Sequence, residues 1–172
     1  MFHKAKTVTT LPDYRLLVHF ANGSDKEYDM KPLFDQYPVF EELKNTSGLF
    51  EQARVDTGGY GIVWNEDVDI DTEEIYQNGT NVITPFTGLI SFSDAAIMKG
   101  LNESTLRKAV EYGKLIQGVD VCNLGKQWVI TKKALDREYP DNGASAIRAT
   151  LQERLKMAES TIIWPTDEGQ SR

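Results

Sequence analysis

The side chains best suited to chemistry lie between Asn102 and Lys108. Ser104, Thr105 and Arg107 fall near the start of an expected helix that covers residues 103–111. Short hydroxyls and a guanidinium near a helix N-terminus are the groups that read base edges in the DNA major groove. This composition predicts a helix that binds double-stranded DNA.

Each polar residue of this region has an expected role. Arg107 is expected to bind a guanine through two hydrogen bonds, whereas lysines hold phosphates without reading sequence. For Arg107 and Lys108 the alternative is a solvated helix face without a ligand. The full set predicted to contact DNA is Asn102, Ser104, Thr105, Arg107, Lys108, Lys114, Asn123, Lys126 and Gln127.

Two helices are expected to position this set. In the first, Ser91 and Asp94 have the spacing of a capping box, and Gly100 supplies the positive φ with which many helices end. Asn102 is a favourable N-cap for the second. On that helix Leu106, Ala109 and Val110 have the spacing of a buried stripe, which leaves the polar residues outside.

A hairpin is expected to follow the two helices. Residues 119–123 and 127–131 are predicted as strands joined around residues 124–126, and Thr131 is expected to cap a third helix. A helix-turn-helix followed by a two-stranded hairpin is a winged helix, here covering residues 89–140.

The same residues resemble a known group of regulators, the excisionase-type helix-turn-helix, which is distantly related to the MerR DNA-binding domain. The resemblance implies a basic residue after the wing turn, matched by Lys126, and an aromatic residue in the returning strand, matched by Trp128. It rests on the segments Ser93–Ala96, Gly100–Ala109, Gly113–Leu115 and Gly125–Thr131.

The first half of the chain predicts a small mixed domain. Residues 6–20 and 26–30 are expected to form a hairpin around an Asn22-Gly23 turn, and residues 39–44 a short helix. Acidic and aliphatic residues alternate over 67–71, as in a half-buried edge strand. Asp71 or Thr72 is expected to cap a helix that ends near Asn78-Gly79.

This half resembles the bacterial domain of unknown function 2442, most clearly in the segments Leu17–Gly23, Tyr28–Pro32 and Gly58–Trp64. The resemblance covers nearly all of residues 1–80 and implies a small α+β domain. It also implies a place alone or beside a DNA-binding domain, and a connection with toxin–antitoxin-like gene pairs.

Charge divides along these boundaries. The chain has a net charge of −7, but residues 81–140 contain 8 basic and 6 acidic groups, against 7 basic and 15 acidic in residues 1–80. This asymmetry is typical of a basic module attached to an acidic one.

Residues 81–88 are expected to be a linker between the two modules. Residues 141–172 are expected to form a helix over 144–159, which packs on its own domain or dimerises, and a mobile tail.

Several classes of function lack support in the sequence. One cysteine and two histidines cannot make a zinc site, and residues 67–78 lack the glycine and bidentate glutamate of a calcium-binding EF-hand. No nucleophile has a partner pattern typical of catalysis. We therefore expect no enzyme, cofactor or metal. The absence of a long apolar run or a secretory signal, and the lone Cys122 (expected to be buried), indicate a cytoplasmic protein that does not enter membranes.

The fold class expected is α+β: a small mixed domain, a winged helix-turn-helix and a C-terminal helix. The function expected is a homodimeric transcriptional regulator that binds double-stranded DNA sequence-specifically, an antitoxin-like autorepressor whose residues 1–80 bind a protein partner or ligand. The alternative is a mobile-element inhibitor, similar in logic to an anti-CRISPR protein, whose acidic domain captures a nucleic-acid enzyme while the winged helix controls its own gene. In a third possibility, the winged helix no longer binds DNA and contacts only proteins.

Overall fold

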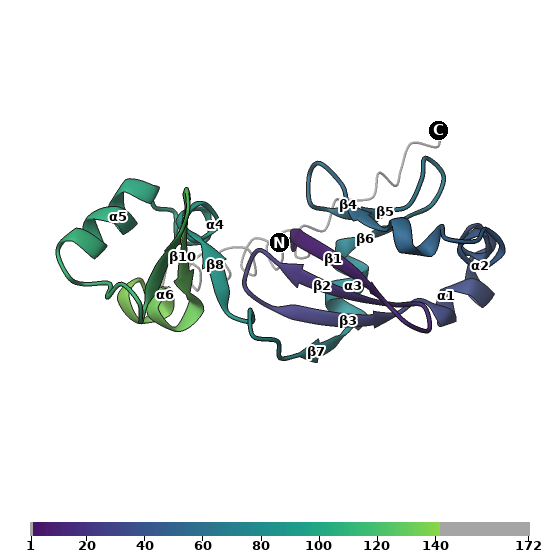
Figure 1. Ribbon diagram of the computed structural model, residues 1–172, viewed down its shortest axis with the longest axis horizontal. Coiled ribbons are helices and arrows are strands. Elements are labelled where there is room, and N and C mark those ends of the chain that lie inside the picture. Colours follow the sequence, from purple (N-terminus) through teal and green to yellow (C-terminus); the bar gives the residue numbers. More distant parts are fainter. Residues whose placement is uncertain (1, 142–172) are drawn as a thin grey trace, which may run out of the picture. The chain divides into compact units, whose positions relative to one another are not determined.

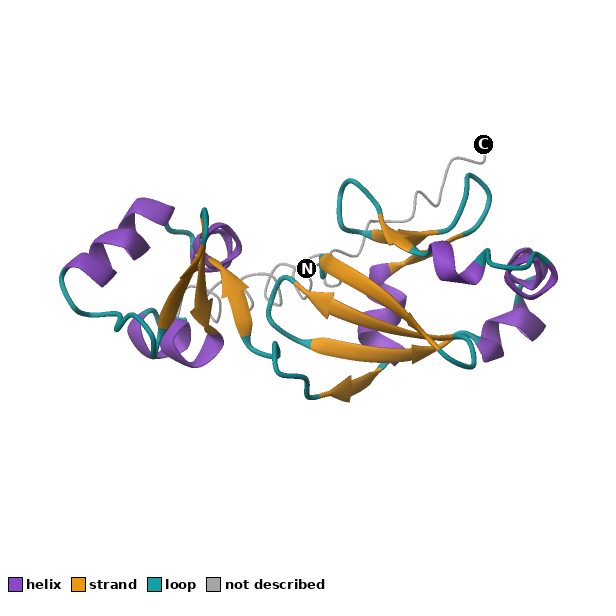
Figure 2. Cartoon of the chain, in the orientation of Figure 1, coloured by secondary structure: helices purple, strands orange, loops and turns teal. Residues whose placement is uncertain are grey.

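The computed structural model describes residues 2–141, which form a mixed arrangement of helices and three antiparallel sheets (Figures 1 and 2). Residues up to Glu138 form one compact unit. The predicted helix over 144–159 and the predicted tail lie outside the described residues.

The largest sheet has the strand order β1-β2-β3-β7. Its strands are β1 (Ala5–Leu11), β2 (Arg15–Phe20), β3 (Asp25–Asp29) and β7 (Thr80–Val82). The predicted turn at Asn22-Gly23 is present, because Gly23 has φ +82° and its N–H donates to the Phe20 carbonyl at 2.9 Å. Since β7 pairs with β3, the sheet extends two residues into the predicted linker.

The prediction of one strand pair over residues 6–30 was incomplete, because residues 6–20 contain two strands. The chain reverses between β1 and β2 at Asp13 and Tyr14, which have φ of +67° and +55°. Pro12 and Asp13 are turn residues and aspartate tolerates this conformation, but tyrosine rarely adopts it, so the sequence did not identify the two-residue left-handed reversal. The Tyr14 ring makes edge contacts with Phe34 and Phe50, which favour this conformation despite its backbone cost.

A second small sheet, in the order β4-β5-β6, and several short helices cover the same core. The strands are β4 (Arg54–Val55), β5 (Gly61–Val63) and β6 (Asp69–Asp71). The helical segments between β3 and β4 are α1 (Lys31–Gln36), η1 (Pro38–Glu41), α2 (Glu42–Asn45) and η2 (Phe50–Gln52). As predicted, β6 is an edge strand with Ile70 buried, and Asp71 caps α3 (Thr72–Asn78) by accepting from Glu73 N–H at 2.7 Å.

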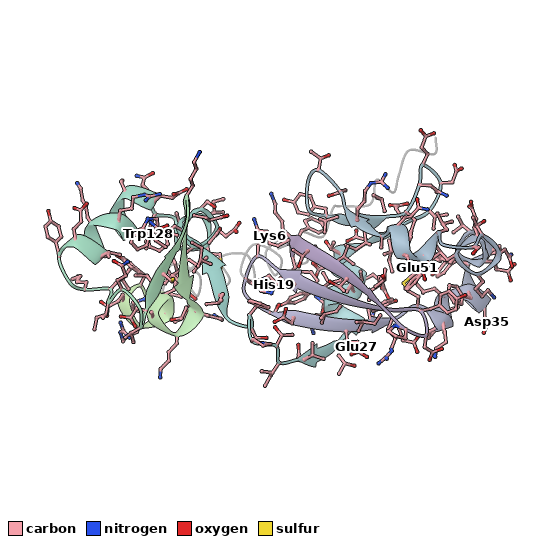
Figure 3. The ribbon with its side chains drawn as sticks, in the orientation of Figure 1. Lys6, His19, Glu27, Asp35, Glu51 and Trp128 are labelled. Atoms are coloured by element: carbon pink, nitrogen blue, oxygen red, sulfur yellow. The ribbon has the colours of Figure 1, made fainter. Side chains whose placement is uncertain are left out.

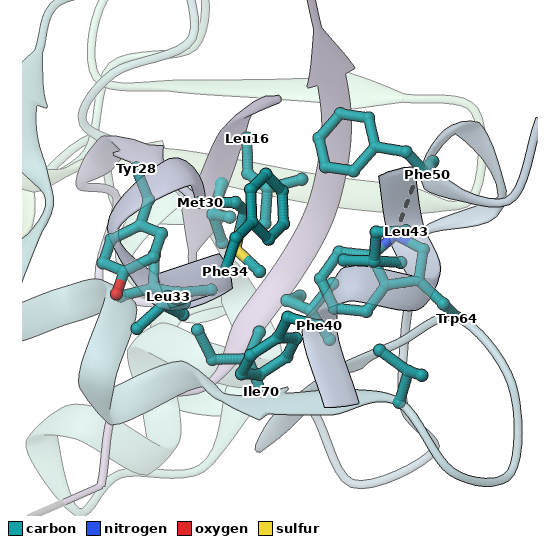
Figure 4. Packing of buried hydrophobic residues seen from close by; sticks show 14 of the residues in the cluster. Leu16, Tyr28, Met30, Leu33, Phe34, Phe40, Leu43, Phe50, Trp64 and Ile70 are labelled. Carbon is teal, nitrogen blue, oxygen red and sulfur yellow. Dashed lines mark hydrogen bonds between the residues drawn. The ribbon is translucent and has the colours of Figure 1, made fainter. Parts of the chain in front are cut away.

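The core of this half is rich in aromatic side chains (Figure 4). Trp64 is 1% exposed and stacks on Phe50, and its indole N–H donates to the Phe50 carbonyl at 2.9 Å. The only polar atom of this ring is therefore satisfied without water. This bond ties β5 and its following turn to η2.

The remaining elements follow a short connection. They are β8 (Leu89–Ser91), α4 (Phe92–Lys99), α5 (Glu103–Glu111), β9 (Val121–Leu124), β10 (Gln127–Thr131) and α6 (Lys132–Glu138). The strands form a sheet in the order β8-β10-β9. β8 was not predicted, because three residues are too few for a periodic pattern.

The bounds of α5 and β10 agree with the prediction, and Thr131 caps α6 as expected through a bond from Ala134 N–H. Ser91 caps α4, but the Asp94 carboxylate accepts from the Ser91 hydroxyl instead of completing a capping box. Asn102 occupies the predicted N-cap position of α5, although its side chain makes no capping bond. β9 begins two residues late because Gly118, with φ +86°, turns the chain there.

Candidate nucleic-acid interface

Helix α5 is fixed by one buried face. Leu106 is fully buried and Ala109 is 4% exposed, as the predicted stripe requires, while Val110 is half-buried. Ala95 and Ala96 on α4 are also buried. This anchoring leaves Ser104, Thr105, Arg107 and Lys108 exposed.

The hairpin of β9 and β10 supplies the second group of predicted residues. Gly125, with φ +68°, makes the turn and places Lys126 and Gln127 at the start of the returning strand. Trp128 follows, half-buried, and stacks on the buried Phe92 with 5.6 Å between ring centroids. Figure 3 shows Trp128 between the hairpin and α5. The indole thereby fixes the hairpin against the start of α4.

An open pocket of about 260 Å³ lies where α5, the hairpin and the start of α4 meet. It brings together three predicted residues from separate elements, Arg107, Lys126 and Gln127. Its full lining is Ser91, Phe92, Ser93, Glu103, Arg107, Lys126, Gln127 and Trp128. A lining that combines two aromatic rings with cationic and amide groups suits a polar, anionic ligand such as a nucleic acid.

The other six predicted residues are exposed but do not line this pocket. Asn102, Ser104, Thr105 and Lys108 lie on α5 or at its cap, and Lys114 follows the left-handed Gly113. Asn123 lies on β9, opposite Trp128. Of the nine predicted residues, the pocket therefore brings together three, and the other six share only their exposure to solvent.

Within the described part of the chain, carboxylates neutralise some basic residues of this region and leave others unpaired. Lys99 and Lys132 both bind Asp136, at 2.9 and 2.8 Å, and Arg137 binds Asp120 through two hydrogen bonds. The Arg137 guanidinium lowers the pKa of Asp120, as Lys132 and Lys99 lower the pKa of Asp136. These carboxylates neutralise cations around α6.

The lysines of the predicted set are different. Within residues 2–141, no carboxylate lies within ion-pair distance of Lys108, Lys114 or Lys126. The same holds for Lys133 on α6. The charges of Lys108, Lys114 and Lys126, which belong to the predicted set, remain available to phosphates. The surface carrying α5 and the hairpin is therefore more cationic than the net charge of +2 over residues 81–140 suggests.

Arg107 is the exception among the predicted cations. Its guanidinium lies 3.4 Å from the Glu103 carboxylate one turn earlier on α5, and both side chains are about half exposed, at 46% and 44%. Exposed pairs of this kind are weak, so the guanidinium can exchange its partner at small cost.

Sequence reasoning missed Glu103, Trp128 and the three residues at the start of α4, Ser91, Phe92 and Ser93, as members of the site. The i, i+4 spacing of Glu103 and Arg107 could have revealed the first, but the others join only through the folded hairpin. The prediction that Cys122 is buried was wrong: its thiol is free and exposed on β9, where only Val121 of the strand is buried.

A separate set of charges lies in the first half of the chain. Among the described residues, eight exposed carboxylates there have no Lys, Arg or His within ion-pair distance: Asp35, Glu41, Glu42, Glu51, Glu66, Asp67, Asp69 and Asp71. Figure 3 shows Asp35 and Glu51 in the region of the short helices. Much of the acidity of residues 1–80 is therefore unneutralised.

Comparison with known families gives one decisive match. The family described as "Protein of unknown function (DUF2442)" covers residues 5–96, more than half of the chain. The chain belongs to this family. The DUF2442 match begins in β1, passes through β7 and β8, and ends within α4, beyond the boundary at residue 80 that the sequence predicted. It does not reach α5 or the hairpin, so the excisionase and MerR resemblance is supported by no family match.

Comparisons with individual proteins add little to the DUF2442 assignment. No curated protein matches the chain. A crystal structure of a candidate DNA-binding protein from Nitrosomonas europaea ATCC 19718 is similar at 18% identity and a TM-score of 0.39, over 64% of this chain and 70% of that one. Similarity of this degree decides neither fold nor function.

Two further searches concern the described residues alone. Among residues 2–141, no helix has the length and apolar character needed to cross a bilayer. Within the same residues, no three His, Cys, Asp or Glu side chains gather as a metal site would require.

Proposed function

We propose that this DUF2442 protein binds double-stranded DNA sequence-specifically, with residues 89–138 acting as a winged helix-turn-helix. The observation that carries the proposal is the convergence of Arg107, Lys126 and Gln127 on one open pocket. In this reading α5 enters the major groove and the β9–β10 hairpin follows the neighbouring backbone, as in other winged helices.

The basic residues of this surface have different roles in the proposal. Arg107 binds a guanine through O6 and N7, while Lys108, Lys114 and Lys126 neutralise phosphates. Each phosphate contact releases a counterion, so affinity falls steeply with salt. Because only a few lysines are available, one subunit binds weakly, and a homodimer on a palindromic site supplies the remaining affinity.

The regulatory role follows from the combination of modules. A DNA-binding half that represses its own operon, joined to an acidic DUF2442 half that binds a protein partner or ligand, is the arrangement of an antitoxin-like autorepressor. The role requires binding alone, and so we propose a regulator and not an enzyme.

A genome-wide DNA selection with the full-length protein tests the proposal. Wild type is compared with Arg107→Ala and with the matched control Lys133→Ala, which removes an exposed lysine from α6, outside the pocket. We expect wild type and the control to enrich one palindrome near the protein's own gene, and Arg107→Ala to lose it. No enrichment by wild type at low salt would contradict DNA binding.

A second function is favoured by the unneutralised carboxylates of the first half. In this alternative, residues 1–80 capture a basic nucleic-acid enzyme, as an anti-CRISPR-like inhibitor of a mobile element does, and the winged helix regulates the gene. Full-length wild type and a Glu41→Gln/Glu51→Gln variant are compared for co-purification of such enzymes. Capture that is equal for both proteins would argue against a charge-based partner surface.

A further inference from the structure

We propose that Glu103 determines base specificity together with Arg107: Glu103 accepts a hydrogen bond from a cytosine amino group beside the guanine that Arg107 reads. This inference rests on the proposed DNA-binding function and names the sequence element that the pocket recognises. The element is a cytosine and a guanine at neighbouring base pairs.

Glu103 lies where it can act together with Arg107. It is the first residue of α5, and Arg107 follows one turn later, so both side chains leave the same face of the helix. Both line the pocket between α5 and the hairpin. At about half exposure, each side chain can reach a ligand without the helix moving.

The two side chains have complementary hydrogen-bonding groups. A carboxylate only accepts hydrogen bonds, and in the major groove cytosine presents a donor, N4–H₂, whereas guanine presents two acceptors. Adenine presents a donor beside an acceptor at N7, which a carboxylate disfavours. Arg107 has the complementary preference, because a guanidinium only donates and matches guanine O6 and N7.

The ion pair between Glu103 and Arg107 also bears on specificity. Glu103 lies 3.4 Å from the Arg107 guanidinium in the free protein, and this weak pair places the two groups side by side in the lining of the pocket. On a site without cytosine at the matching position, the carboxylate enters a phosphate-rich groove without a donor, which is costly for a buried charge. Glu103 thus acts against wrong sequences as well as for the right one.

A purely structural ion pair on the surface of α5 is the competing explanation. Such a pair stabilises the helix slightly and leaves base preference unchanged. The two explanations differ in the measured motif, which helix stability does not affect.

The test is an in vitro selection of random duplex DNA with full-length wild type, Glu103→Gln, Glu103→Ala and Arg107→Ala, followed by titration of the selected site and its single-base variants. Glu111→Gln is the matched control, because Glu111 is an exposed acid on the same helix outside the pocket. Thermal melting of each variant verifies folding.

We expect Glu103→Gln to change one position of the motif from cytosine to adenine, since a glutamine amide pairs with adenine N6 and N7. Discrimination for cytosine there should fall about tenfold, on the scale of one base contact. Glu103→Ala should lose the preference without gaining a new one, and the position read by Arg107 should stay guanine in both variants.

The outcomes separate this inference from the proposed function. If wild type selects no sequence, DNA recognition itself fails. If wild type selects a motif that Glu103→Gln and Glu103→Ala leave unchanged, the DNA-binding function stands and the role of Glu103 is overturned. An equal change caused by Glu111→Gln would also overturn it, because a general charge effect would then explain the result.

Discussion

Glu73 accepts hydrogen bonds from three donors. They are the Gln77 amide at 2.6 Å and the ring and backbone nitrogens of His3 at 2.9 and 3.1 Å. Together these donors, the Gln77 amide first, lower the pKa of the Glu73 carboxyl to about 2. The two contacts from His3 help to fasten the residues before β1 to α3, together with the Thr72 hydroxyl, which donates to the His3 carbonyl at 2.8 Å.

The pH dependence of stability follows from this shift. The pKa of Glu73 is lower in the folded protein than its ordinary 4.5, so its contribution is complete above pH 4.5 and is lost as the pH falls toward 2. We expect wild type to lose more stability than Glu73→Gln between pH 5 and pH 2, measured by urea unfolding at each pH. Parallel curves for the two proteins would contradict the assignment.

Lys126 is expected to bind a phosphate, since no carboxylate within residues 2–141 pairs with it. Lys126→Ala should weaken binding to all DNA sequences alike and lower the slope of log K against log salt by about 1. Fluorescence anisotropy at several salt concentrations measures this slope. Lys133→Ala, the control on α6, should leave the slope unchanged.

The turn between α4 and α5 depends on one glycine. Gly100 has φ +64°, ends α4, and would have no heavy atom within 4 Å of an added Cβ. A substitution there meets backbone strain and no steric clash.

Gly100→Ala is therefore expected to lower the free energy of unfolding by about 1–2 kcal/mol, the cost of placing a Cβ in the left-handed region. Gly100→Asn should cost less, because asparagine tolerates this conformation. Chemical denaturation of both variants decides the order. Equal losses would show that strain is not the cause.

The elements that the sequence predicted well are those with a local signal at both ends. Helix α3 lies between the capping Asp71 and Gly79, and α5 follows from the spacing of Leu106 and Ala109. β8 is too short to carry such a signal, and the turn residues Pro12 and Asp13 do not specify the left-handed reversal at Asp13-Tyr14. The first is stabilised by pairing with β10, and the second by packing of the Tyr14 ring, both of which exist only in the folded chain.

The candidate site, too, was predictable only in part. The exposure of Arg107 and Lys126 followed from helix and hairpin patterns. The pocket did not, because it requires α5, the hairpin and the start of α4 to be folded against one another, with Trp128 packed on Phe92. A contact between elements that are distant in sequence produces no periodic pattern in the sequence of either element.

At the scale of the whole molecule, Asp25 links the first sheet to the connection that leads to β8. Its carboxylate is 3% exposed and interacts with His19 Nδ1 at 2.8 Å and with the hydroxyls of Thr84 and Thr87. Gly23 and Gly88 meet beside it, where the Gly88 N–H donates to the Gly23 carbonyl and an added Cβ on Gly23 would lie 3.0 Å from Gly88 Cα. Figure 3 shows His19 at this end of the sheet.

Asp25→Ala should therefore destabilise the whole unit, by about 3 kcal/mol, since it removes a buried acceptor and leaves its donors unpaired. Asp29→Ala, at the exposed end of the same strand, is the control and should cost much less. Urea unfolding measures both values. A loss for Asp25→Ala no greater than that of the control would show that the cluster does not hold the connection.

The exposed thiol of Cys122 has a practical consequence. It is the single cysteine of the chain and lies on the hairpin one residue before Asn123, in the surface expected to meet DNA. A maleimide dye or nitroxide spin label will therefore attach at one defined place in the natural protein. Its emission or electron spin resonance spectrum will then report, in real time, whether the hairpin becomes immobilised when an oligonucleotide is added.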